Sequence, residues 1–336
     1  MNVAINGFGR IGRNFLRTYV QDKTAQDLFA ISTINIGNAD PKMIAYMFTY
    51  DTLMGTYKGS VAFKSDTLQV DNHSFHIIAE MDARKLPWKS EKIDWVVDCT
   101  GAFTKREKAT QHRDSGARYV LISAPAHDED ISIIPGVNMA LFDPEKHFIV
   151  SLGSCTTNAL IPLLSVLHQT FEINDAYMNT VHAYTNSQAL LDVEKDDPRR
   201  SRAAALNIIP TTSGAVKMVE KVIPTLKNKV DGLALRVPVG KVSFLDLSFT
   251  TQKRISEQSI IDAFQESMKH TMKGIIDITD QPLVSSDFFG NNYSVVIDKP
   301  LTKVQGTIGK VFGWYDNEWG YSVRLKDFLK YVAKQK

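Results

Sequence analysis

The sequence has little of several features that would narrow its class. It has only two cysteines, Cys99 and Cys155, in 336 residues, too few for a disulfide framework and in keeping with a reducing compartment. Its 39 basic and 37 acidic residues leave a net charge of +2, which gives no reason to expect a nucleic acid or a membrane as partner. No apolar run approaches the roughly 18 residues of a membrane span, and the N-terminus enters a strand without a secretory signal. A cytoplasmic protein is expected.

Hydrophobic residues make up 43% and charged residues 23% of the chain, the balance of a soluble globular protein. The length allows two domains of roughly 150 residues each. Strand and helix candidates alternate in the first half, which predicts a doubly wound, mostly parallel sheet. The second half has longer strands and one clear amphipathic helix, which predicts an α+β domain with a mainly antiparallel sheet. The expected strands are residues 3–5, 29–35, 95–98, 119–122, 148–150, 177–184, 232–239, 242–250 and 293–297, and the expected helices are 13–19, 105–115, 260–268 and one over 325–332.

A glycine-rich turn follows the first strand. Gly7, Gly9 and Gly12 form G-x-G-x-x-G between a predicted strand and a predicted helix, the context that favours a dinucleotide over an ordinary strand–helix turn. The second strand ends in Asn35-Ile36, where the fingerprint expects an acid on the ribose 2′-OH. Without that acid a 2′-phosphate is admissible, but no nearby arginine binds it, so NAD and NADP both stay open. Thr100 and Ser123 follow later strands, where they suit either the edge of a cofactor or an ordinary loop.

Cys155 lies between Ser154 and Thr156, after an apolar strand and before an apolar segment. A helix starting here would place the thiol at a helix N-terminus, where the free N–H groups and the macrodipole lower its pKa. The alternative is a buried structural cysteine. His182, in a later strand, is a candidate base for an activated Cys–His pair, against the alternative of a structural histidine.

Two groups of basic and hydroxyl residues indicate an anion site. Residues 199–202 include three arginines, and residues 211–214 read Thr-Thr-Ser-Gly. Arg236 stands inside an apolar strand, where an unpaired charge is costly. An anionic ligand or an acidic partner is expected to meet it, and hydroxyls, glycine N–H groups and arginine are groups that bind phosphate.

Six strings resemble the phosphorylating glyceraldehyde-3-phosphate dehydrogenase family, in the family's order and over essentially the whole chain. They are INGFGRIGR at 5–13, SCTTN at 154–158, HAYT at 182–185, RAAALNIIP at 202–210, RVP at 236–238 and WYDNEWGY at 314–321. The resemblance implies a Rossmann-type NAD(P)-binding domain, residues 1–154 with the C-terminal helix 319–336, and an α+β catalytic domain, residues 155–318. It also implies a homotetramer in which the loop 187–202 reaches a neighbouring cofactor site.

The activity implied is oxidative phosphorylation of D-glyceraldehyde 3-phosphate to 1,3-bisphosphoglycerate, in glycolysis or gluconeogenesis, without a metal. Cys155 looks like the nucleophile that carries the thioester, and His182 like its general base. The substrate-phosphate ligands implied are Thr185, Arg200 and Arg236; those of the incoming phosphate are Ser154, Thr156, Ser213 and Gly214; those of the cofactor are Arg10, Ile11, Asn35, Met81, Ser123 and Asn317.

The chain departs from the family at several positions. Ile36 replaces the usual acid that selects NAD, Glu194 replaces a usual proline of the reaching loop, and Ser187 replaces a frequent aspartate. Gly153 departs from the usual approach to the nucleophile. Two other functions are compatible with the fold. Erythrose-4-phosphate dehydrogenase is disfavoured by the retained Ala-Tyr-Thr after the histidine and by the Thr-x-x-Gly loop. A non-enzymatic nucleotide-sensing or adhesive protein is disfavoured by the retained cysteine, histidine and Arg236.

Overall fold

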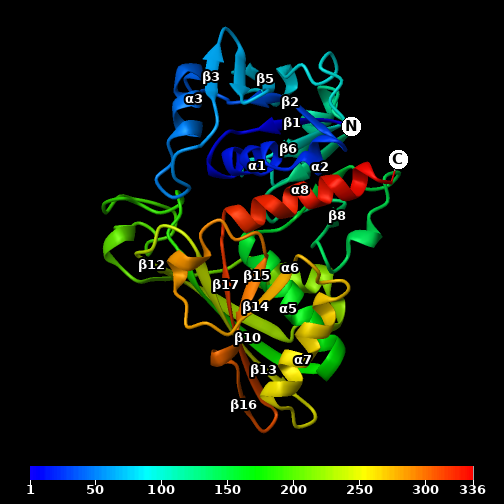
Figure 1. The fold of residues 1–336 in the computed structure, drawn as a ribbon, viewed down its shortest axis with the longest axis vertical. Helices are drawn as coiled ribbons and strands as arrows, with labels where there is room; N and C mark the ends of the chain where they lie inside the picture. The colour runs from blue at the N-terminus through cyan, green and yellow to red at the C-terminus, as the bar shows by residue number, and fades with distance from the viewer. Residues whose placement is uncertain (336) are drawn as a thin grey trace. The chain divides into compact units, whose positions relative to one another are not determined.

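The computed structural model describes residues 1–335, which divide into two compact units (Figure 1). The first unit comprises Met1–Ile133, Met139–Gly153 and the chain from Ser322 onward, and the second comprises Ile134–Asn138 and Ser154–Tyr321. The sequence-based boundary lay between residues 154 and 155. In the structure Ser154, a short segment at 134–138 and residues 319–321 belong with the second unit.

The first unit is built on a nine-stranded sheet that is parallel except at one edge. Its order is β3 (Val61–Lys64), β4 (Thr67–Val70), β5 (His73–Ile78), β2 (Ala30–Asn35), β1 (Asn2–Asn6), β6 (Trp95–Asp98), β7 (Tyr119–Ile122), β9 (Ile149–Ser151) and β8 (Ile131–Ser132). Only the pairs β3–β4 and β4–β5 are antiparallel. The predicted doubly wound, Rossmann-type sheet is confirmed. Loops at the carboxyl ends of its parallel strands are the expected ligand site.

The central strands of this sheet are buried along their whole length, as in β6 and β7, because helices cover parallel sheets on both faces. The helices are α1 (Arg10–Val20), α2 (Lys23–Gln26), α3 (Pro41–Thr49), α4 (Arg106–Asp114) and α8 (Trp319–Ala333), the last contributing its residues from Ser322 onward. The ring of Phe328 on α8 packs edge-on against Trp95 and Phe142. The C-terminal helix therefore packs into the core of the first unit, as its apolar stripe predicted.

The second unit has an eight-stranded, mainly antiparallel sheet. Its order is β11 (Ile209–Thr211), β12 (Val230–Val237), β10 (Ile173–Ala183), β13 (Ser243–Thr251), β17 (Ile308–Tyr315), β15 (Val295–Asp298) and β14 (Ile276–Thr279), with β16 (Lys303–Gln305) paired to β17. Two pairs, β10–β12 and β14–β15, are parallel. Helices α5 (Cys155–Phe171), α6 (Ala215–Val222) and α7 (Glu257–Met268) gather on one side of this sheet (Figure 1). Their buried apolar side chains share one core with those of the sheet.

The long strand β17 is absent from the sequence-based prediction. Gly309 and Gly313 interrupt its apolar pattern, and glycine weakens a strand when local propensity alone is considered. The tertiary structure requires them, because a Cβ at Gly309 would overlap the ring of Phe249 and one at Gly313 would overlap Val295. Packing of neighbouring strands therefore decides this element.

Among residues 1–335, no helix combines the length and apolarity needed to cross a membrane. Within the same residues, no group of three or more His, Cys, Asp or Glu side chains is arranged to hold a metal ion.

Candidate active site

Cys155 is the first residue of α5, and the turn before it is fixed by a reciprocal cap. The Ser154 hydroxyl accepts the N–H of Thr157 at 3.1 Å, and the Thr157 hydroxyl accepts the N–H of Ser154 at 3.1 Å. A capping box of this kind defines where a helix begins. The sequence-based placement of the cysteine at a helix N-terminus therefore agrees with the structure.

The thiol faces His182, which lies near the carboxyl end of β10. Cys155 Sγ is 3.5 Å from His182 Nε2. The pKa of His182 is lowered to about 3, mainly by burial and next by the charge of Arg236. The imidazole is then neutral at neutral pH, and its two tautomers differ in their contacts. With the proton on Nδ1, that nitrogen donates to the Ala183 carbonyl, 2.7 Å away, and Nε2 can accept the thiol proton; with the proton on Nε2, Nδ1 instead accepts from Arg236.

The expected lowering of the Cys155 pKa is wrong for this structure. Burial of the thiol raises its pKa, and this effect outweighs the opposing charge of Arg236 and the hydrogen bonds from Thr156. The pair therefore rests as a thiol beside a neutral imidazole, and the nucleophile forms when the proton moves to His182.

Arg236 is brought to this pair by strand register. The parallel pairing of β10 and β12 sets Arg236 opposite His182, and its Nη1 lies 2.8 Å from His182 Nδ1 and donates to the Ala183 carbonyl at 3.1 Å. Within the described chain Arg236 forms no ion pair, and its buried Nε has no hydrogen-bond partner. Burial lowers its pKa. The structure thus retains a partly desolvated cation beside the His182 imidazole, on the side away from the thiol, and such a cation suits an anionic ligand.

The other predicted phosphate ligands lie on loops around this unit's sheet. Arg200 donates through Nε to the Thr211 hydroxyl at 2.9 Å and pairs with Asp197 at 3.5 Å, so it is held against the loop that contains Ser213 and Gly214. Gly214 is the N-cap of α6 and supplies no capping side chain. The first N–H of that helix, on Ala215, is bonded instead to the Ser213 hydroxyl at 3.3 Å, which places Ser213 at the helix N-terminus. The Thr185 hydroxyl is bonded to Ser187 at 2.9 Å.

Tyr315 is a site residue that sequence reasoning did not single out. Its hydroxyl is 2.9 Å from that of Thr156 and 2.6 Å from that of Thr180, and its ring meets the His182 ring edge-on at 6.0 Å. Burial raises its pKa, so it stays a neutral phenol that orients Thr156 and supports the imidazole. The only signal for it was its place within the string at 314–321.

In the first unit, the three glycines after β1 have three different environments. Gly7 has a positive φ of 92°, and a Cβ there would lie 2.6 Å from Thr100 Cγ2. A Cβ at Gly12 would overlap the Gly7 carbonyl, whereas one at Gly9 would meet nothing within 4 Å. Helix α1 starts after Gly9 with no side-chain cap. A tight turn, an open approach and close helix packing fit a dinucleotide pyrophosphate at this helix N-terminus.

The remaining predicted cofactor residues of this unit follow the carboxyl ends of its strands. Arg10 pairs with Asp51 at 2.7 Å, Asn35 ends β2, and Met81 is exposed and lies beside Gly37. Ile11 lies in the first turn of α1, and Thr100 and Ser123 follow β6 and β7. Asn317 belongs to the second unit, where its Oδ1 accepts the N–H of Val242 at 3.0 Å.

Known proteins resemble this chain along its whole length. Residues 1–106 match the family described as "Glyceraldehyde 3-phosphate dehydrogenase, NAD binding domain", and residues 154–317 match its "C-terminal domain". The chain is 43% identical to "Glyceraldehyde-3-phosphate dehydrogenase" of Streptomyces coelicolor, covering 100% of this chain and 99% of the relative. It is 42% identical to "Glyceraldehyde-3-phosphate dehydrogenase 2" of Bacillus subtilis, covering 99% of this chain and 97% of the relative. The chain therefore belongs to the glyceraldehyde-3-phosphate dehydrogenase family.

Proposed function

We propose that this protein oxidises and phosphorylates D-glyceraldehyde 3-phosphate to 1,3-bisphosphoglycerate with NAD or NADP, in glycolysis or gluconeogenesis. The observation that carries the proposal is the arrangement of Cys155, His182 and Arg236. The thiol is 3.5 Å from a neutral imidazole, and beside that imidazole lies a half-buried arginine that forms no ion pair in the described chain. A nucleophile, a base and an anion ligand are thereby held in one unit.

In the first half of the reaction, His182 Nε2 removes the proton of Cys155, and the thiolate attacks the aldehyde carbon to form a hemithioacetal. The backbone N–H of Cys155 stabilises the resulting oxyanion, and the protonated His182 returns its proton to that oxygen to give the hemithioacetal hydroxyl. His182 then takes the hydroxyl proton as the hemithioacetal is oxidised to the thioester. A bound nicotinamide dinucleotide supplies the hydride acceptor for this oxidation.

In the second half, inorganic phosphate attacks the thioester carbonyl, the acyl–sulfur bond breaks, and the acyl phosphate leaves with the Cys155 thiolate restored. Arg236, Arg200 and Thr185 bind the substrate phosphate. Ser154 and Thr156 with Ser213 and Gly214 receive the attacking phosphate. Because the hydroxyl of Thr156 bonds to Tyr315, its contribution to the anion is its backbone N–H.

The resemblance also supports a homotetramer in which the loop 187–202 reaches a neighbouring subunit. Three apolar side chains of this loop, Leu190, Leu191 and Val193, are 83%, 71% and 56% exposed. Large apolar side chains gathered on one exposed segment are typical of a surface that another protein covers. Sedimentation equilibrium tests this assembly, and a monomeric mass at micromolar concentration would contradict it.

The activity is tested by following NAD(P)H absorbance with the aldehyde and phosphate present. Without phosphate, a single burst of about one NAD(P)H per active site is expected, because the thioester accumulates. Cys155→Ala is expected to abolish both the burst and the turnover, whereas Cys99→Ser, which alters the other buried thiol, retains them. Full turnover by Cys155→Ala would refute the mechanism. A higher kcat/KM for erythrose 4-phosphate than for the triose phosphate would favour the alternative dehydrogenase.

A further inference from the structure

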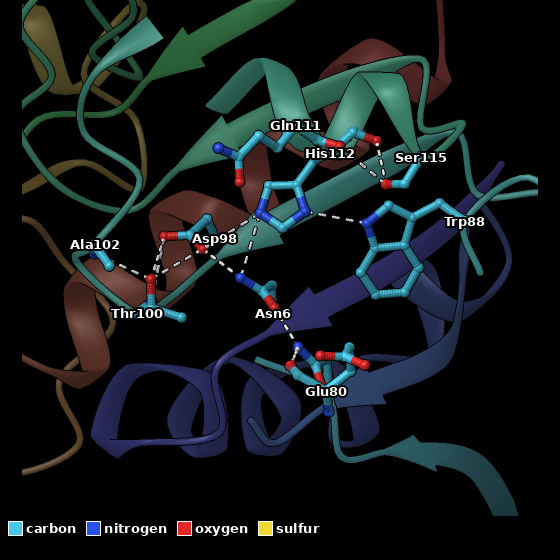
Figure 2. Close-up of polar contacts among 10 residues, drawn as sticks. Asn6, Glu80, Trp88, Asp98, Thr100, Ala102, Gln111, His112 and Ser115 are labelled. Atoms are coloured by element: carbon cyan, nitrogen blue, oxygen red, sulfur yellow. Dashed lines mark hydrogen bonds and ion pairs between the residues drawn. The ribbon is translucent and has the colours of Figure 1, made fainter. Parts of the chain in front are cut away.

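A polar network of buried side chains lies at the carboxyl edge of the first unit's sheet (Figure 2). Trp88 Nε1 lies 3.1 Å from His112 Nδ1, and His112 Nε2 lies 3.8 Å from Asp98 Oδ2. Asn6 donates to the same Asp98 oxygen at 2.7 Å, and Asn35 donates to Asn6 Oδ1 at 2.7 Å. All five side chains are buried. Four of them have no part in the function proposed so far.

The chemistry of these side chains determines which atoms of the polar network donate and which accept. An indole N–H can only donate, so His112 Nδ1 accepts from Trp88 and the ring proton is on Nε2. Nε2 lies 3.3 Å from the Asn6 amide nitrogen and 3.8 Å from Asp98 Oδ2, so its contact with the carboxylate is electrostatic. Asp98 also accepts from Asn6 Nδ2 and from the hydroxyl and backbone N–H of Thr100. Since each of these neighbours is a donor, the position requires an acceptor-only carboxylate. This carboxylate fixes the amide of Asn6 with its oxygen toward Asn35.

The Asn35 side chain, at one end of this polar network, holds two loops of the dinucleotide site in place. The Asn35 amide nitrogen donates to Asn6 and to the Glu80 carbonyl, the latter at 2.9 Å. Its oxygen accepts the N–H groups of Glu80 at 3.1 Å and Gly37 at 3.3 Å. Both ends of this amide are therefore in use inside the protein. The Asn35 side chain holds the loops that follow β2 and β5.

The same carboxylate holds the loop that follows β6. Asp98 accepts the Thr100 hydroxyl at 2.9 Å, and the Thr100 methyl lies where a Cβ on Gly7 would collide with it. One buried group thus supports the glycine turn, the end of β2 and the loop after β6, three segments that a dinucleotide requires at the carboxyl edge of the sheet.

We propose that Asp98 is a positioning residue of the dinucleotide site, with His112 and Trp88 holding it in its acceptor role. His112 lies on α4, and Trp88 lies between β5 and β6. Both act through Asp98. The inference rests on the dinucleotide binding proposed above. Disrupting this polar network is expected to weaken dinucleotide binding and to leave the chemistry of the Cys155 thiol unchanged.

Three variants test this proposal by calorimetric titration with NAD and with NADP. Asp98→Asn, which places an N–H₂ group among donors, is expected to raise the Kd of the dinucleotide about tenfold or more. Trp88→Phe keeps an aromatic ring but removes the donor to His112, and it is expected to weaken binding less. Trp95→Phe is the matched control, because this buried indole packs on Tyr119 and lies outside the polar network. The rate of Cys155 alkylation by iodoacetamide is expected to be equal in all three.

The tautomer of His112 is a second measurement, and it would not change if the polar network served only to stabilise the fold. Nitrogen-15 NMR, with the signals identified by their loss in His112→Gln, is expected to show a neutral ring protonated on Nε2 in the wild type. Trp88→Phe is expected to give a mixture of both tautomers, and Trp95→Phe no change. An Nδ1-protonated or charged ring in the wild type would refute the proposal, as would wild-type affinity in Asp98→Asn.

If Asp98→Asn does not fold, Trp88→Phe decides the matter, since an unchanged tautomer and an unchanged Kd would overturn the inference. Failure of the wild type to bind either dinucleotide would instead refute the proposed function, and this inference with it.

Discussion

Replacing Arg236 by methionine isolates the electrostatic effect of this arginine on the reactive thiol. Arg236 lowers the pKa of Cys155 and that of His182, so both pKa values should rise in the variant. The imidazole separates the guanidinium from the sulfur, since Nη1 is 2.8 Å from Nδ1 and Sγ is 3.5 Å from Nε2. Two charges roughly 7 Å apart at an effective dielectric constant near 20 interact by about 2 kcal/mol. That energy corresponds to a thiolate fraction about thirtyfold smaller in the variant at a pH well below the pKa of Cys155.

The assay is the pH dependence of alkylation by iodoacetamide, a neutral reagent that reacts with the thiolate and needs no substrate site. A Cys99→Ser background leaves Cys155 as the only thiol. The midpoint of the rate profile is expected to move to higher pH in Arg236→Met. Arg200→Met is the control, because Arg200 affects His182 only weakly and is paired with Asp197. A midpoint that moves no further in Arg236→Met than in Arg200→Met would show that the arginine does not act on the thiol.

Three further predictions concern stability and cofactor affinity. The pKa of His182 is about 3 in the folded state against 6.5 for the free group, so the unfolded chain binds more protons between these pH values. The contribution of His182 to the free energy of unfolding is therefore fully present above pH 6.5 and falls by about 1.4 kcal/mol per pH unit below it. His182→Asn is expected to reduce this slope in urea titrations. Gly9→Ala, with open space around its Cβ, should keep the wild-type Tm but lose dinucleotide affinity, whereas Gly12→Ala should lower Tm through overlap with the preceding turn; equal Tm values for the two would contradict the packing argument. Lys241 and Asp316 form a fully buried ion pair at 2.9 Å, so Lys241→Met should cost about 3–5 kcal/mol of unfolding free energy and the added Asp316→Asn should recover part of it. No recovery in the double variant would show that the unbalanced charge of the carboxylate is not the cause.

The local sequence predicts those helices and strands whose hydrophobic pattern matches the burial of their side chains in the structure. The buried strands β6 and β7 were predicted with the bounds that they have, and α1 was predicted although it begins at Arg10 rather than at residue 13. The strand β17 was missed, because its glycines are required by side chains from neighbouring strands. The hairpin of β3 and β4 was also missed; its strands are four residues each and half exposed, which leaves little pattern to detect.

The sequence by itself determined which residue types carry the chemistry: a cysteine at a helix start, a glycine-rich turn after the first strand, and an arginine in an apolar strand. It also determined the family, through six strings in order. Only the tertiary structure decided the electrostatics. The register of β10 and β12 sets Arg236 beside His182, burial reverses the expected direction of the Cys155 pKa, and three strand ends meet at Asp98. Register and burial arise from contacts between segments far apart in the chain, and no local pattern encodes them.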